Sequence, residues 1–397
     1  MYKHRLPRLL IFAIGILLSG RGQFVLALPA VPTDACALPE KPAGSPEETA
    51  WQIFVAINCK VANQQLTWET WKTQACLNNP ADCNVRRLHG SVLRAANTKE
   101  STSHHPRRTG ACSAMTTKDT ADPSLAPFVP ANLNEKEKEK PQFCEEVTIN
   151  ASEEAYATRK GLLTNAGQMT FLQSGGTISF PTGAVEVKAD WVAASSYNGS
   201  VTFDCKSPNT TTIYQEKIGD ICYALTGMHI SSKLYPKWLW ATFEPQNKAT
   251  NPNRCNPDLY NVCYDPWGSV PAKSKGKKTK ISLELAALFD KAGTALDPSF
   301  RNYRLVGTQT AFDQPAVSHA NLGNSFVEFN AGVKPGQASC ITCHNYAQRA
   351  ISGAAAGSTP GGLPPDGSAA VDNPTPLPTT YKSLDFSWLL GLGVPSQ

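Results

Sequence analysis

Hydrophobic and polar residues alternate through the middle of the chain, and this pattern predicts β-strands. Residues 185–191 are apolar at every second position, the period expected of a strand with one buried face. Residues 238–243 form a nearly continuous apolar run, which predicts a strand buried on both faces. Together with residues 211–214 and 221–230, these segments predict a substantial, mainly antiparallel sheet.

Signals for helices are fewer and flank this region. The run Ser45-Pro46-Glu47-Glu48 has the hydroxyl, proline and glutamate order of a helix start, so a helix is expected from about Pro46 to Cys59. A second helix is expected from Ser282 to Ala292, with Gly293 as its C-terminal cap. The whole pattern predicts an α+β fold, in which a β-rich domain carries a few peripheral helices.

Composition divides the 397 residues further. A stretch at about 97–141, rich in Ser, Thr, Lys and Glu, is predicted to be a solvated insertion in a β-rich domain that covers residues 31–330. Residues 353–380 are rich in Gly, Pro and Ala and are predicted to form an extended strap. The strap leads to a short apolar C-terminal end at 381–397, and the segment before it, 331–352, carries the motif described below.

The first 30 residues have the order of a secretory signal peptide. Basic residues up to Arg8 precede an apolar stretch from Leu9 to Leu18, and small residues follow between Ala27 and Ala30. An uncleaved membrane anchor is the alternative, but the apolar stretch is about half of the ~20 residues that a spanning helix needs. No apolar run of spanning length follows. We therefore predict export to the periplasm and no membrane span in the mature chain.

Net charge gives no indication of a nucleic-acid partner. The chain has a formal charge of +5, but four of its basic residues lie in the signal segment, which has no acidic residue. The mature chain is therefore close to neutral, so neither nucleic acid nor an anionic membrane surface is expected as a partner.

Twelve cysteines in an exported chain indicate an oxidising compartment. Two of them belong to the motif below, and the remaining ten are enough for five disulfides. The short intervals from Cys76 to Cys83 and from Cys255 to Cys263 predict local loop-closing bonds. The other pairings do not follow from spacing, and buried free thiols are an alternative for some of these cysteines.

The segment Cys340-Ile341-Thr342-Cys343-His344 has the Cys-x-x-Cys-His pattern of covalent haem attachment. Two thiols three residues apart on a helical turn can each add to a haem vinyl group, while the adjoining imidazole reaches the iron. We therefore predict one haem c, bound through Cys340 and Cys343, with His344 as the proximal iron ligand. A redox dithiol, a zinc site and a structural disulfide are the alternatives. A dithiol does not need the histidine, and a zinc site usually shows a second closely spaced Cys or His pair.

A second iron ligand has to come from upstream, because no Met or His follows His344. This placement argues against the small cytochrome c fold, in which the motif lies near the N-terminus. His229 is the preferred distal ligand, because it ends a predicted strand on which Met228 points to the opposite face. A hydrogen-bonded structural role is the alternative for His229, and His319 is the second choice. The remaining candidates are Met169, Met115, His89, His104 and His105.

The chain resembles a group of exported bacterial monohaem proteins that are labelled as cytochrome c family. The segments that carry the resemblance span nearly all of the mature chain, in the order 51–58, 68–72, 187–191, 228–230, 238–244, 339–344 and 385–390. The resemblance implies a protein with one covalent haem whose large N-terminal region belongs to the same family and is not a fusion partner.

These features lead to three functional hypotheses. The first is one-electron transfer between redox protein partners in the periplasm. The second is catalysis or sensing of a small ligand at an open distal iron site, and the third is solute binding with an accessory haem. The sequence shows no acid–base constellation beside the motif, which favours an electron carrier over an enzyme.

Overall fold

The computed structural model describes most of the chain after the predicted signal segment. The described residues are 34–61, 64–78, 87–88, 91–92, 123–135, 138, 143–199, 201–218, 221–259, 262–312, 321–331, 334–336, 338–351 and 380–390. All of them belong to one compact unit, which begins at Pro32. The predicted signal peptide, nearly all of the strap at 353–380 and the last seven residues lie outside the described part.

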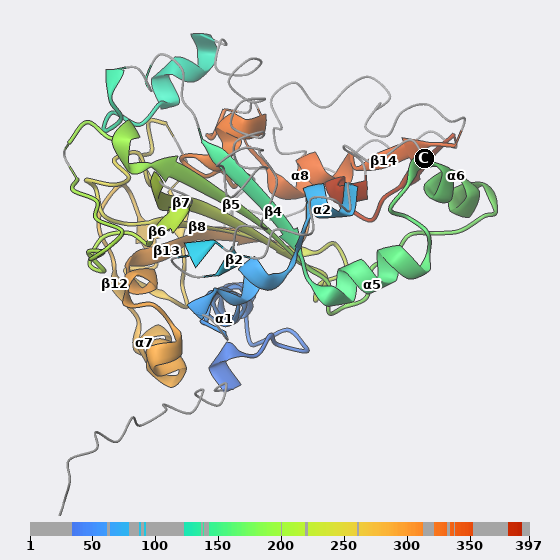
Figure 1. The fold of residues 1–397 in the computed structure, drawn as a ribbon, viewed down its shortest axis with the longest axis horizontal. Coiled ribbons are helices and arrows are strands. Elements are labelled where there is room, and N and C mark those ends of the chain that lie inside the picture. The colour runs from blue at the N-terminus through green and yellow to red at the C-terminus, as the bar shows by residue number, and fades with distance from the viewer. Residues whose placement is uncertain are drawn as a thin grey trace, which may run out of the picture. The chain divides into compact units, whose positions relative to one another are not determined.

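A seven-stranded antiparallel sheet forms the centre of the fold (Figure 1), which confirms the predicted α+β, β-rich class. Its main path runs through β1 (Lys72–Thr73), β4 (Cys144–Ile149), β5 (Val185–Ala193), β7 (Ile221–Ser232), β8 (Leu239–Pro245) and β13 (Tyr303–Gln309), and β6 (Gln215–Ile218) also pairs with β7. The predicted strand at 211–214 was placed too early. Residues 210–212 form a turn, and pairing begins at Gln215.

Helix α1 (Pro46–Asn58) covers one face of the sheet and confirms the first predicted helix. The side chain of Ser45 caps it by accepting a hydrogen bond from the backbone N–H of Glu48 at 3.1 Å. The rings of Phe54 and Phe243 stack with their centres 4.2 Å apart, so α1 is anchored on β8. The alternating apolar residues of β5 contribute to this same hydrophobic cluster.

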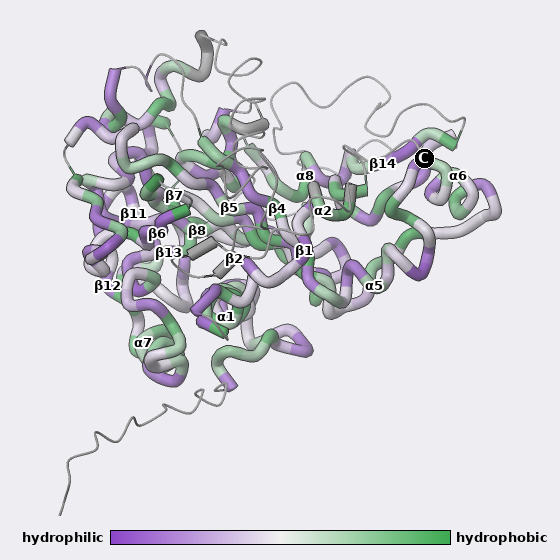
Figure 2. The backbone as a smooth tube through the Cα atoms, viewed as in Figure 1, coloured by the Kyte–Doolittle hydropathy of each residue, from purple (hydrophilic) through white to green (hydrophobic). Residues whose placement is uncertain are grey.

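Helix α7 (Leu283–Ala292) confirms the second predicted helix. Ser282 caps its start, and Gly293 follows its last residue with a φ of 56°, which a glycine adopts without strain. Figure 2 shows hydrophobic and hydrophilic residues alternating along α7, as expected of a surface helix.

The opposite face of the sheet is also covered, which differs from the prediction of one exposed face for residues 185–191. The polar positions Glu186 and Asp190 are 8% and 0% exposed. The reason is that segments 321–351 and 380–390 pack over them, where α8 (Cys340–Asn345) lies in Figure 1. Strand β8 is buried on both faces, as its continuous apolar run predicted.

Shorter elements complete the described fold. The helices are α2 (Gln74–Asn78), α5 (Ala151–Arg159) and α6 (Asn165–Gln173). The two-stranded pairs are β2 (Arg87–Leu88) with β3 (Ser91–Val92), β9 (Cys263–Tyr264) with β11 (Lys273–Ser274), β10 (Ser269–Val270) with β12 (Lys280–Ile281), and β14 (Gln348–Ala350) with β15 (Tyr381–Ser383). Within the described ranges, no helix is long and apolar enough to cross a membrane.

Part of the predicted solvated insertion at 97–141 packs on the domain. Leu133 is fully buried and forms a β-bridge with Tyr197, and the Asn132 amide donates to the carbonyl of Ala249 at 2.8 Å. Most of the insertion lies outside the described residues, so the predicted solvated insertion can be compared with the structure at its C-terminal end alone.

Disulfides join cysteines throughout the described part of the chain. Cys36 is bonded to Cys59, Cys205 to Cys222 and Cys255 to Cys263, and Cys76 and Cys144 are also disulfide-bonded. The predicted bond from Cys255 to Cys263 is thereby confirmed. The predicted partner of Cys76, Cys83, lies outside the described residues.

Candidate haem-attachment site

The Cys-x-x-Cys-His motif forms the short helix α8, the helical turn that haem attachment requires. Strand β13 anchors its start, because Gln309 accepts a hydrogen bond from the backbone N–H of Ile341 at 3.1 Å and its amide donates to Ser339 at 3.2 Å. Cys340 and Cys343 are free thiols. The structure therefore does not form the structural disulfide that was one alternative for this motif.

A cavity of about 370 Å³ opens between the polar face of the sheet and the C-terminal segments, within the range of about 300–1,000 Å³ typical of ligand and cofactor sites. Its wall brings together all four residues predicted from the sequence, namely Cys340, Cys343, His344 and His229. Strands β4, β5, β7 and β8 contribute one side of it, and Trp388 and Leu389 contribute to the other.

His344 is held by one ring nitrogen. Its Nδ1 lies 2.8 Å from the carbonyl oxygen of Phe386, which as an acceptor selects the tautomer with the proton on Nδ1. Burial lowers the pKa of His344 to about 3, with Lys188 and His229 adding to the effect and the Phe386 carbonyl opposing it. The imidazole is therefore neutral and its Nε2 lone pair is unprotonated, the state in which histidine binds a metal.

Both thiols of the motif are kept protonated. Burial raises the pKa of Cys343 to about 11 and that of Cys340 well above its usual range, and the Glu328 carboxylate adds to both shifts. A redox dithiol depends on a thiolate with a lowered pKa. The surroundings of Cys340 and Cys343 thus oppose the redox-dithiol alternative.

His229 faces the cavity because of its register in β7. Its neighbour Met228 points to the other face, where the Asn58 amide of α1 contacts the Met228 sulfur at 3.8 Å. Only one of the two side chains therefore faces the cavity that the Cys-x-x-Cys-His motif lines, as strand alternation predicted. The Nε2 atom of His229 lies 3.2 Å from a carboxylate oxygen of Glu328, but the two groups are not oriented to form a hydrogen bond.

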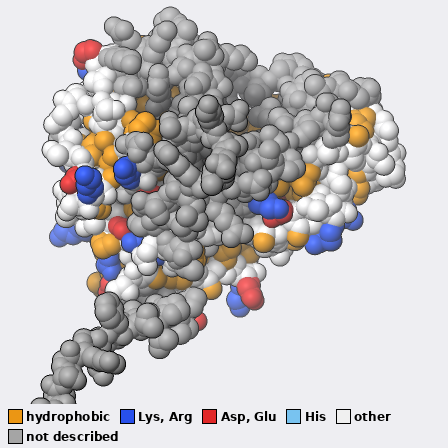
Figure 3. Space-filling model, in the orientation of Figure 1, with side chains coloured by type: hydrophobic (Ala, Val, Ile, Leu, Met, Phe, Trp, Pro, Cys, Tyr) orange, Lys and Arg blue, Asp and Glu red, His pale blue; other side chains and the backbone are white. Residues whose placement is uncertain are grey.

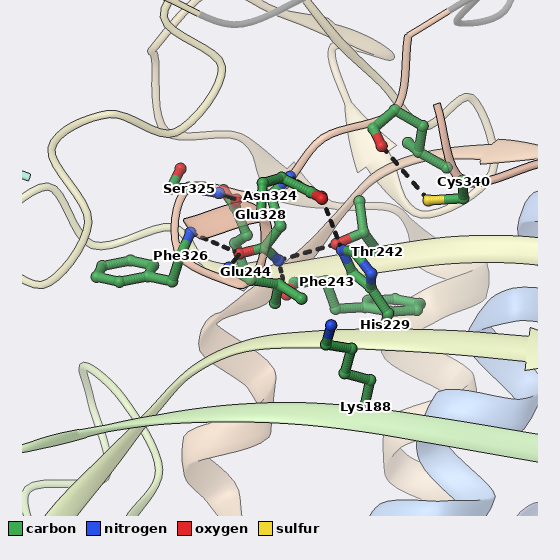
Figure 4. A network of polar contacts seen from close by, with 12 residues as sticks. Lys188, His229, Thr242, Phe243, Glu244, Asn324, Ser325, Phe326, Glu328 and Cys340 are labelled. Atoms are coloured by element: carbon green, nitrogen blue, oxygen red, sulfur yellow. Dashed lines mark hydrogen bonds and ion pairs between the residues drawn. The ribbon is translucent and has the colours of Figure 1, made fainter. Parts of the chain in front are cut away.

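The loop that carries Glu328 is fixed over the sheet (Figure 4). Asn324 donates from its side chain to the Thr242 hydroxyl at 2.8 Å and from its backbone to Glu328 at 2.9 Å. The backbone N–H of Ser325 donates to the carboxylate of Glu244 in β8. The position of the Glu328 carboxylate beside His229 is therefore set by several hydrogen bonds.

Lys188 lies beside His229 on the neighbouring strand and also lines the cavity (Figure 4). Its ammonium group pairs with Glu145 at 2.6 Å. Burial alone would lower the pKa of Lys188, but the carboxylates of Glu145, Asp190 and Glu328 outweigh it and raise that pKa. The lysine is therefore charged, and it places a cation on the cavity wall.

Sequence reasoning missed Lys188 and Glu328. The alternation in β5 placed Lys188 on the polar face, but nothing in it indicated that this face is buried. Glu328 follows no recognisable motif, and its place beside His229 depends on contacts between segments about 100 residues apart.

None of the other predicted iron ligands is among the described residues that line the cavity. The sulfur of Met169 accepts a hydrogen bond from Arg349 at 3.3 Å and does not line the cavity. The second-choice ligand His319 lies outside the described residues, as do His89, His104, His105 and Met115.

No protein family model, curated protein or solved structure matches this chain. Its fold and site define an α+β protein with a half-buried Cys-x-x-Cys-His turn facing a cavity beside an antiparallel sheet. Among the described residues, no group of three or more His, Cys, Asp or Glu side chains is placed to hold a metal ion directly. The zinc alternative therefore finds no ligand set in that part of the chain.

Proposed function

We propose that this protein is an exported c-type cytochrome with one covalent haem, which transfers single electrons between periplasmic redox proteins. Cys340 and Cys343 would hold the haem through thioether bonds, and His344 would bind its iron. The residues fit such a group, because two free thiols and a neutral imidazole lie on the wall of one cavity. When bound, the haem supplies a one-electron iron couple.

The observation that carries this proposal is the hydrogen bond from His344 Nδ1 to the Phe386 carbonyl. Histidines that bind a metal nearly always donate their other ring N–H to a carbonyl or carboxylate, which fixes the ring and its tautomer. In this chain the partner comes from a segment 42 residues further on, so the fold itself orients the imidazole.

His229 is proposed as the distal ligand because its side chain lines the same cavity as His344. The carboxylate of Glu328 lies 3.2 Å from one of its ring nitrogens, which places an outer partner beside the second histidine as well. Two histidine ligands would give a low-spin iron with a lower reduction potential than His/Met ligation, in line with an electron carrier.

Binding of a small ligand at an open iron site is the second candidate. It is favoured by the polar wall of the cavity, where charged Lys188 lies beside His229 and the carboxylates of Glu145 and Glu328. A polar distal pocket with hydrogen-bond donors suits ligand binding or activation at a haem. In this case Glu328 would keep His229 away from the iron.

Replacing His229 by alanine separates the two candidates. If His229 binds the iron, His229→Ala should convert a low-spin optical and resonance Raman spectrum to a high-spin one that accepts added ligands. Met169→Leu is the matched control, because Met169 lies outside the cavity and the substitution preserves volume. An unchanged low-spin spectrum in His229→Ala contradicts the distal assignment, and a high-spin wild-type spectrum supports the open-site candidate.

A further inference from the structure

A pair of buried carboxyl groups adjoins the proposed haem cavity. Glu186 in β5 lines the cavity. The Asn150 side chain accepts hydrogen bonds from the backbone N–H groups of Glu153 at 3.1 Å and of Val185 at 3.3 Å, which sets the first turn of α5 against the start of β5 and brings the charge of Glu186 to bear on Glu153. Glu153 is fully buried, and neither of its carboxyl oxygens has a hydrogen-bond partner among the described residues. An isolated buried carboxylate without donors is very unfavourable, so the Glu153 carboxyl has to carry a proton.

The neighbouring described side chains do not supply a positive charge that would balance two ionised carboxyl groups at Glu153 and Glu186. The Ser387 hydroxyl donates to Glu186 at 2.5 Å, which satisfies one oxygen without supplying charge. Asp385 is the other charged group that acts on both carboxyls, and its negative charge is balanced by Lys233 at 2.6 Å. Glu154, the neighbour of Glu153, turns away and pairs with Lys72.

The charges near the pair favour its protonated form. Burial raises the pKa of Glu153 well above its ordinary value, and the nearby Glu186 and Asp385 raise it further. Burial also raises the pKa of Glu186. One shared proton leaves the pair with a single negative charge, and a second proton makes it neutral.

The pair is connected to the proposed iron ligand through two consecutive residues. Phe386 accepts the hydrogen bond of His344, and Ser387, the next residue, donates to Glu186. A change of charge on an iron bound to His344 would therefore act on the two carboxyl groups through a buried region, where charges interact more strongly than in water.

We propose that Glu153 and Glu186 share one proton in the oxidised protein and bind a second one when the haem is reduced. This inference rests on the proposed function. When one electron enters from a donor protein, the pair takes up one proton from solvent. When that electron passes to an acceptor, the proton is released, so electron and proton are both conserved over the cycle. The protein would thereby couple proton uptake to electron transfer.

The test is the reduction potential of the full exported protein, measured by optical titration at a series of pH values. For the wild type, the potential should fall as pH rises above the ordinary range of a glutamate carboxyl. The slope should approach about 59 mV for each tenfold fall in proton concentration, the conversion for a one-electron couple. Glu153→Gln should reduce this slope, because only the Glu186 carboxyl is then left to exchange a proton and a neighbouring amide N–H stabilises its ionised form.

Glu154→Gln is the matched control, since it removes a carboxyl from the same helix turn without touching the pair, and it should keep the wild-type slope. An equal slope in Glu153→Gln and wild type would overturn the proposal. If Glu153→Gln fails to fold, the redox difference infrared spectrum of the wild type decides. A carboxylic acid band that changes on reduction supports the pair, and its absence refutes it. A protein without covalent haem would instead refute the proposed function.

Discussion

At Gly227 the sheet lies so close to the loop that contains Asn324 that a methyl group would not fit between them. A Cβ atom at this position would lie 2.5 Å from the side-chain oxygen of Asn324. Asn324 is fully buried and holds four hydrogen bonds through its side chain, so it has no space to move. Glycine at 227 therefore permits the contact that positions Glu328 beside His229.

Gly227→Ala should accordingly destabilise the protein by about 1–3 kcal/mol, the usual effect of overpacking. Urea unfolding measures the change. Gly183→Ala serves as the control, because its Cβ would lie 3.2 Å from the Ser152 hydroxyl, which can rotate, and 3.6 Å from the Ser152 Cβ, an ordinary contact. Equal stability of Gly227→Ala and wild type would show that the loop is not tightly seated on the sheet.

The residues of the site differ in how far the sequence predicts them. Cys340, Cys343 and His344 form a local motif, so their spacing alone indicates the chemistry. His229 follows from strand alternation, because Met228 has to face the other way. Glu328 and the pair of Glu153 and Glu186 depend on contacts between distant segments, which no local pattern reveals.

Among the elements, helices α1 and α7 were predicted almost to the residue because their ends carry local signals, whereas α2, α5 and α6 were not predicted. Ser45 and Ser282 cap α1 and α7, and Gly293 ends α7 in the conformation that glycine favours. The strands were harder to predict. Alternation located β5 but not the burial of its polar face, since that burial is caused by a segment about 200 residues further along the chain.

The cap of α1 offers a test at this scale. Ser45→Ala should destabilise the protein by about 1 kcal/mol, because the backbone N–H of Glu48 loses its acceptor. Ser45→Asp keeps an acceptor at the same place and should remain close to wild type. Urea unfolding of the two variants provides the comparison, and similar losses in both would contradict a capping role for Ser45.

At the scale of the whole molecule, different segments of the chain pack on the two faces of the sheet. Helix α1 closes its apolar face, and the segments that carry the motif close its polar face (Figure 1). The cavity that both histidines line lies between these motif-bearing segments and the sheet. The large N-terminal region is thus part of the proposed haem site, because it supplies His229 and the cavity wall.

The described side chains on the face seen in Figure 3 give little sign of a strongly charged partner. Acidic and basic side chains are interspersed on the face seen in Figure 3, in keeping with the nearly neutral mature chain expected from the sequence. A redox partner that docks on this face would therefore do so without strong long-range electrostatic steering.

The intact mass of the protein purified from the periplasm of a bacterium with haem-attachment machinery tests the central claim most directly. The account predicts the chain cleaved between about Ala27 and Ala30 plus one haem, which acid-acetone should fail to extract. The double variant Cys340→Ser/Cys343→Ser should have the same cleaved chain without covalent haem. A wild-type mass equal to that of the bare chain, or haem lost to extraction, would contradict the account.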